Sequence, residues 1–152
     1  NLTTRWSGRA GIPPPEGKRA PESTLTLKGV PSKSRPPLTW TVVPVWFAWD
    51  GSALWVSAFS STRKVKDLEE NPLISVAIDE TKDNDATRAV ILEGKAELLR
   101  EPAEFLKRQF TWIYARYVGE EHVGEAKYQD WIVDPENTLI KLIPLKVFTW
   151  KW

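Results

Sequence analysis

Two runs of β-branched and aromatic residues, Leu38–Trp49 and Ala53–Phe59, are separated by Asp50 and Gly51. Runs of this composition favour strands, and Asp-Gly tolerates the positive φ values that a tight hairpin turn requires. An Asp-Gly turn joins two strands that lie side by side and antiparallel. The sequence therefore predicts a β-hairpin at Asp50-Gly51, and the fold has to be built around an antiparallel sheet.

Helices are predicted at three places after the hairpin. A Ser/Thr cluster and a following proline bound a short helix over 61–71. Pro102 suits the first turn of a longer helix that ends near Gly119, and weaker periodicity predicts another helix over 120–131.

Further strands are expected over 73–79, 87–99 and 137–152, the last of them interrupted at Pro144 by an edge or a bend. The total is about six or seven strands and two or three helices, without a regular alternation of strand and helix. The predicted fold class is therefore mainly β, an antiparallel barrel with peripheral helices.

The first 37 residues differ from the rest of the chain. They contain seven prolines, and seven Lys or Arg residues against two Glu. Proline removes a backbone donor and favours extended conformations, so we expect a basic, proline-rich N-terminal arm over 1–37, with 23–28 as its one plausible strand. A length of 152 residues fits one domain, which we place at 38–152.

Composition excludes several kinds of chemistry. Without cysteine the chain has no disulfide, thiolate metal site or thiol nucleophile, and its single histidine, His122, lies in a polar stretch, so no metal site is expected. No apolar run reaches the length of a membrane span, and a net charge of +1 gives no broad basic field for nucleic acid. We expect a cytoplasmic protein without a membrane or nucleic-acid partner.

The start of the helix over 61–71 has an unusual charge pattern. Helix N-termini favour acidic residues because their free N–H groups carry partial positive charge, yet the first turn has Arg63 and Lys64 and no carboxylate before Asp67. The hydroxyl residues before them are Ser60, Ser61 and Thr62. Amides, hydroxyls and two cations at one point suit a phosphate. The alternative is that the hydroxyl cluster only caps the helix while both cations point into water, and the segment by itself favours neither.

Two strand positions are irregular. Pro44 lacks an N–H group, so it indicates either an edge strand or a gap in the ladder whose free backbone groups could bond a planar heterocycle. Gly94 lies inside the strand over 87–99, where glycine marks a β-bulge or a close approach by a ligand. The bulge is the favoured interpretation.

Four segments carry a more specific pattern. They are Val43-Pro-Val-Trp-Phe-Ala-Trp-Asp-Gly51, Leu54-Trp-Val-Ser57, Arg63-Lys-Val-Lys-Asp-Leu68 and Asn71-Pro-Leu-Ile-Ser-Val76. Together they resemble the pyridoxamine 5′-phosphate oxidase-like family of FMN-binding split barrels. Gly94 is similar in place to a strand glycine of that family, and residues 143–150 resemble its closing strand. The resemblance covers about residues 38–152 and implies an antiparallel split β-barrel.

The resemblance also implies cofactor contacts and an assembly. Pro44, Val45 and Trp46 would lie along the isoalloxazine ring, largely through main-chain groups. The residues that would hold the ribityl phosphate are Ser57, Ser60, Ser61, Thr62, Arg63 and Lys64. The family pattern implies a homodimer with the flavin at the subunit interface, where Trp150 or Trp112 of one chain would cover the flavin of the other. Gly94 is included in the cofactor site, and no catalytic residue is assigned.

The expected function is that of an FMN-binding flavoprotein, an oxidoreductase that transfers hydride through the flavin to or from a small-molecule substrate. Such chemistry suits a chain with one histidine and no cysteine because no side chain has to act as a nucleophile. Two alternatives use the same scaffold: a deazaflavin-dependent reductase and a flavin-binding module without turnover.

Overall fold

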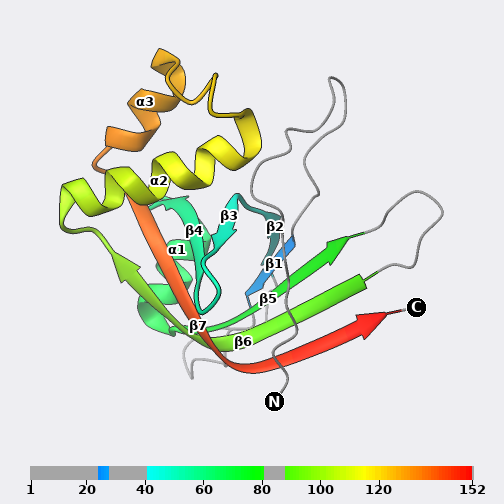
Figure 1. Cartoon of the computed structure of the whole chain (residues 1–152). Coiled ribbons are helices and arrows are strands. Elements are labelled where there is room, and N and C mark those ends of the chain that lie inside the picture. The colour runs from blue at the N-terminus through cyan, green and yellow to red at the C-terminus, as the bar shows by residue number, and fades with distance from the viewer. Residues whose placement is uncertain (1–23, 28–40, 81–87, 152) are drawn as a thin grey trace.

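The computed structural model describes residues 24–27, 41–80 and 88–151. The elements in chain order are β1 (Thr24–Leu27), β2 (Thr41–Pro44), β3 (Phe47–Trp49), β4 (Leu54–Phe59), α1 (Arg63–Glu70), β5 (Leu73–Glu80), β6 (Arg88–Leu99), α2 (Ala103–Val118), α3 (Ala126–Val133) and β7 (Asn137–Lys151). β1 confirms the strand expected over 23–28, and the rest of the predicted arm lies outside the described residues. Figure 1 shows α2 and α3 together at one end of the molecule, with the long strands β5, β6 and β7 extending away from them.

The strands form one antiparallel sheet in the order β2-β1-β5-β6-β7-β4-β3. The strands at its two ends, β2 and β3, are consecutive in the chain and are joined by only Val45 and Trp46. The three Cα–Cα steps from Pro44 to Phe47 span at most about 11 Å, so the sheet has to curl until its two ends lie close together. Within the described strands β2 and β3 do not pair, so the barrel is split at this seam. The predicted fold class, an antiparallel split β-barrel with peripheral helices, is confirmed.

The predicted hairpin is present, with a connection of four residues, 50–53. Gly51 has a φ of +103°. Asp50 Oδ1 accepts hydrogen bonds from the N–H groups of Ser52 at 2.8 Å and Ala53 at 2.7 Å, and its Oδ2 accepts one from Trp55 Nε1 at 2.8 Å. The carboxylate of Asp50 therefore fixes the turn and ties it to the first residues of β4.

The core has two layers, one on each face of β4. Leu54, Val56 and Ala58 belong to the cluster inside the barrel, which α1 joins through Val65 and Leu68. On the other face Trp55 packs with α2, and this second layer includes Phe110, Ile113, Tyr114, Ile132 and Leu139. Side chains alternate between the two faces of a strand, so β4 contributes to both layers and is buried on both faces.

Three predicted elements differ in the structure. The run 38–49 is broken between β2 and β3 rather than continuous. β7 passes through Pro144 without interruption, because Leu145 is an extra residue of β7 that forms a bulge opposite Glu93 and Gly94 of β6. The helix predicted over 120–131 begins only at Ala126, because α2 ends at Gly119, with φ of +91°, and turns follow it.

Candidate functional site

A pocket of about 190 Å³ opens at the seam of the barrel. It is lined by Val45, Trp46, Ser57, Ala58, Phe59, Lys64, Tyr114 and Trp131. These residues come from the link between β2 and β3, from the end of β4, and from α1, α2 and α3. The pocket therefore lies where the ladder is interrupted and where the helices meet the sheet. Val45, Trp46, Ser57 and Lys64, all expected in the cofactor site, lie together here.

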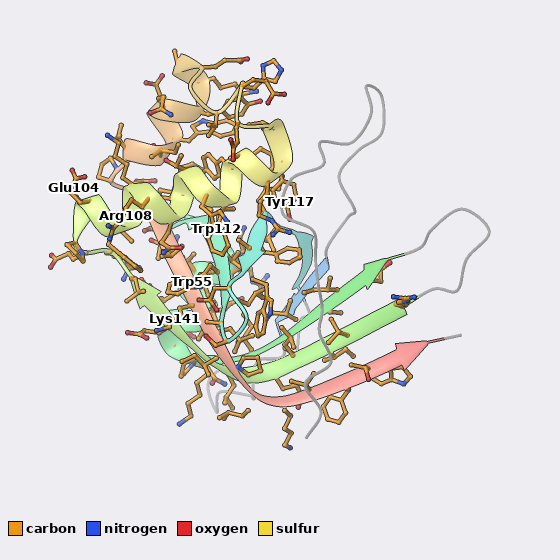
Figure 2. The ribbon with its side chains drawn as sticks, in the orientation of Figure 1. Trp55, Glu104, Arg108, Trp112, Tyr117 and Lys141 are labelled. Atoms are coloured by element: carbon orange, nitrogen blue, oxygen red, sulfur yellow. The ribbon has the colours of Figure 1, made fainter. Side chains whose placement is uncertain are left out.

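Trp46 is held by the end of α2. Its ring stacks on that of Tyr117 at a centroid distance of 5.0 Å and an interplanar angle of 6°. Tyr117 lies at the far end of α2 from Glu104 (Figure 2), and its hydroxyl accepts a hydrogen bond of 3.1 Å from the N–H of Phe47. The carbonyl of Trp46 accepts a bond of 3.4 Å from the N–H of Ser57. The seam is therefore tied to both β4 and α2.

Three aromatic rings from three different elements form one wall of the pocket. Tyr114 of α2 meets Trp46 edge-on at 5.3 Å and Trp131 of α3 edge-on at 6.3 Å. Trp46 and Trp131 are 6.5 Å apart. Edge-to-face contacts of this kind stabilise aromatic clusters. The result is an apolar wall with flat faces, which suits a planar ligand.

Lys64 is the cation of the pocket. Its side chain is half-buried in the first turn of α1, and burial lowers the pKa of its ammonium group, with no charged partner contributing. In the described part of the chain no carboxylate forms a salt bridge with it. Partial burial of an unpaired charge is unfavourable, so a bound anion at this point would supply an interaction that the described residues do not provide.

Below the aromatic wall lies a ring of hydrogen bonds among Ser57, Tyr114 and Asn137. Ser57 Oγ lies 3.0 Å from the Tyr114 hydroxyl and donates to Asn137 Oδ1 at 2.9 Å. Asn137 Nδ2 donates to the Tyr114 hydroxyl at 3.0 Å and to the carbonyl of Trp131 at 2.8 Å. Burial raises the pKa of Tyr114, and its hydrogen bonds with Ser57 and Asn137 offset this only in part. Asn137, 3% exposed, thus joins β4, α2 and α3 beneath the pocket.

The other residues of the predicted phosphate cluster are arranged differently. Ser60 Oγ donates to the carbonyl of Glu136 at 3.0 Å, and Thr62 Oγ1 donates to that of Phe59 at 2.6 Å. Ser61 is exposed, and Arg63, also exposed, forms an ion pair of 3.6 Å with Asp67. Of the residues 60–64, Lys64 alone lines the described pocket.

Three further predicted residues, Gly94, Trp150 and Trp112, lie outside the lining of this pocket, and the backbone alone places Pro44. Pro44 ends β2, opposite Thr24 of β1. Gly94 of β6 lies opposite the bulge of β7, where an added Cβ would meet the carbonyl oxygen of Ile143 at 2.8 Å, so the close approach is made by β7. Trp150 stacks on Phe148 near the end of β7 at 6.2 Å. Trp112 lies on α2 between Arg108 and Tyr117 (Figure 2) and packs against the helix-side core.

Sequence reasoning missed Tyr114, Trp131 and Asn137. Tyr114 follows Phe110 by one helical turn, so a polar aromatic on the apolar face of α2 was the available signal. Trp131 and Asn137 carry no local signal, because their contacts are with residues far away in the sequence.

Among the described residues, no group of three or more His, Cys, Asp or Glu side chains is arranged to hold a metal ion. None of the described helices is long and apolar enough to cross a membrane.

The fold and the pocket together define a class: a split antiparallel barrel with a pocket at its seam, formed by aromatic rings and by Lys64, which has no salt bridge to any described residue. The chain belongs to the pyridoxamine 5′-phosphate oxidase family, whose model matches residues 23–151. No match was found among curated proteins.

Solved structures with the same fold include a conserved hypothetical protein from Mycobacterium tuberculosis, with 24% identity over 88% of this chain and 78% of that one and a TM-score of 0.64. A FAD-binding protein from Mesorhizobium loti is 18% identical over 88% of this chain and 87% of that one, with a TM-score of 0.60. An F420 reductase is 20% identical over 86% of this chain and 90% of that one, with a TM-score of 0.61.

Proposed function

We propose that this chain binds FMN at the barrel seam, with the phosphate at Lys64 and the flavin ring against Val45 and Trp46. The observation that carries the proposal is the half-buried Lys64 ammonium, which has no charged partner among the described residues and lies beside a wall of aromatic rings. An anion joined to a planar ring system matches both features. Membership of the pyridoxamine 5′-phosphate oxidase family supports the same assignment.

The start of α1 adds donors to this site. In the described part of the chain the backbone N–H groups of Arg63 and Lys64, the first two residues of the helix, have no carbonyl partner. Free N–H groups at a helix N-terminus favour an anion, and a carboxylate is absent from this first turn. The residues present therefore fit a phosphate group.

We further propose an oxidoreductase activity. A bound flavin supplies hydride transfer, and the protein supplies binding, orientation and exclusion of water. Here Lys64 would anchor the phosphate, and the wall of Trp46, Tyr114 and Trp131 would orient the ligand. A neighbour named F420 reductase supports a deazaflavin as the second candidate cofactor, since its tail is also anionic.

We also propose a homodimer that completes the site. A pocket of about 190 Å³ is smaller than the roughly 300–1,000 Å³ typical of ligand sites, so one chain covers only part of a flavin. The outer half of β7 pairs with β6 alone, and its apolar side chains are exposed: Ile143 by 55%, Leu145 by 73% and Val147 by 57%. A contiguous apolar surface of this kind marks an interface.

The cofactor is identified by the mass of the chromophore released when the purified protein is denatured, and by titration of the apoprotein with FMN. FMN in the preparation, or saturable binding of added FMN, is the expected result. A colourless preparation that binds neither FMN nor a deazaflavin would refute the proposal. Oxidation of NADH or NADPH by the reconstituted protein separates an enzyme from a binding module.

The phosphate contact is tested with Lys64→Ala. Loss of a charge-assisted hydrogen bond of about 1.5–3 kcal/mol predicts FMN binding that is weaker by about tenfold or more. Lys66→Ala is the matched control, because Lys66 lies on the same helix but is exposed and outside the pocket lining. Equal affinities of the two variants would contradict the assignment of Lys64.

The dimer is tested by sedimentation of the parent chain and of Leu145→Glu. A dimeric parent and a monomeric variant with weaker FMN binding are expected, because a buried carboxylate would be unpaired in the interface. A parent chain that stays monomeric at every concentration would refute the dimer.

A further inference from the structure

The ring of Ser57, Tyr114 and Asn137 has a fixed direction. The carbonyl of Trp131 can only accept, so the atom of Asn137 that faces it at 2.8 Å has to be Nδ2. Oδ1 then faces Ser57, which donates its single hydrogen to it at 2.9 Å. With that hydrogen used, Ser57 accepts from the Tyr114 hydroxyl at 3.0 Å, and Tyr114 accepts from Nδ2 at 3.0 Å. Both hydroxyl hydrogens are therefore donated within the protein.

This direction determines what the pocket offers to a ligand. Ser57 and Tyr114 both line the pocket, and each has only a lone pair left for it. Lys64, on the same pocket, has only donors. The site is thus polarised: it can donate at Lys64 and accept at the Ser57 and Tyr114 hydroxyls.

We propose that the Ser57–Tyr114 wall is a subsite for a hydroxyl or N–H group of the bound ligand, and that Asn137 is the positioning residue that sets its polarity. The inference rests on the proposed function, in which the ligand is a flavin with a hydroxylated ribityl chain. It assigns Ser57 to the uncharged part of the cofactor, where the family pattern had implied a phosphate contact.

The burial of the ring supports this assignment. Asn137 is 3% and Tyr114 2% exposed, so neither can exchange its partner for bulk water without a rearrangement. Burial also raises the pKa of Tyr114, so its phenol keeps the proton that it donates to Ser57. Reversal of the ring would turn an Asn137 oxygen toward the Trp131 carbonyl, which is unfavourable.

The test compares FMN with riboflavin, which lacks the phosphate, as ligands of the parent chain, Ser57→Ala and Lys64→Ala. Ser57→Ala is expected to weaken the binding of both flavins by the same factor, about three- to tenfold. Lys64→Ala is expected to reduce the preference for FMN over riboflavin. Tyr114→Phe, which removes one hydroxyl from the same wall, is a second variant and is expected to weaken both flavins equally.

The role of Asn137 is tested in a cycle of Asn137→Ala and Ser57→Ala. If Asn137 acts through the two hydroxyls, the loss of riboflavin affinity in the double variant is smaller than the sum of the two single losses, whereas additive losses would show that Asn137 only supports the fold. Weakened binding of FMN alone in Ser57→Ala would overturn the inference and leave the proposed function intact. A parent chain that binds neither flavin would overturn both.

Discussion

Replacement of Asn137 by alanine removes the centre of the pocket's hydrogen-bond ring. The side chain has three partners: the Ser57 hydroxyl, the Tyr114 hydroxyl and the Trp131 carbonyl. The two hydroxyls keep the bond of 3.0 Å to each other, and the Trp131 carbonyl keeps only its longer bond of 3.4 Å from the N–H of Asp134. Each of the three lost hydrogen bonds contributes about 0.5–1.5 kcal/mol, so we expect a loss of about 2–4 kcal/mol in the free energy of unfolding.

The loss is measured by urea unfolding followed by tryptophan fluorescence, and by thermal melting. A change of this size lowers the melting temperature by roughly 5–15 °C in a chain of this length. Asn71→Ala is the control, because the Asn71 Oδ1 atom accepts one exposed bond of 3.1 Å from Leu73, and we expect a loss of about 1 kcal/mol or less. If the two variants unfold at the same urea concentration, the ring does not stabilise the pocket and the reasoning is wrong.

Two further predictions concern the sheet. Burial alone would raise the pKa of Asp50, but hydrogen bonds from the Ala53 and Ser52 N–H groups, the Trp55 indole and the Ser52 hydroxyl lower it. The stabilisation that ionised Asp50 gives the folded state is therefore complete above about pH 4 and is lost as pH falls through the lowered pKa. The urea midpoint of the parent should therefore exceed that of Asp50→Asn at pH 7 and approach it in acid; an equal difference at both pH values would contradict this. Gly94→Ala should cost about 1–3 kcal/mol, because the new Cβ would meet the Ile143 carbonyl oxygen at 2.8 Å, whereas Gly124→Ala, with no atom within 4 Å, should be near neutral in the same melts. A Gly94→Ala melt that matches that of Gly124→Ala would refute the steric account of the bulge.

Most elements of the fold were predictable because their signals are local. Asp50-Gly51 between two apolar runs specifies a hairpin, and the Ser/Thr cluster with Pro72 bounds α1. The break between β2 and β3 was predictable only as one of two interpretations of Pro44, because a proline marks an edge or a gap without saying which. Gly94 likewise indicated either a bulge or a close approach by a ligand. The carbonyl oxygen of Ile143 makes the close approach and explains why a glycine lies there.

The site was predictable only in part. The cations at the start of α1 stood out because they oppose the charge preference of a helix N-terminus, but sequence could not tell which of them faces a pocket. The structure places Lys64 in the pocket lining and Arg63 in an exposed pair with Asp67. Neighbouring residues of a helix point in different directions, and the docking of α1 on the barrel decides which one is buried.

The sequence by itself determined the antiparallel sheet, the hairpin and the unusual charge at the start of α1, because turn chemistry, periodicity and local charge act between near neighbours. Only the tertiary structure decided the inner wall of the pocket and its polarity. Ser57 meets Tyr114 and Asn137 across separations of 57 and 80 residues, and the carbonyl of Trp131 orients the Asn137 amide. The direction of a hydroxyl hydrogen depends on which partners the fold brings to it, and no local pattern encodes that choice.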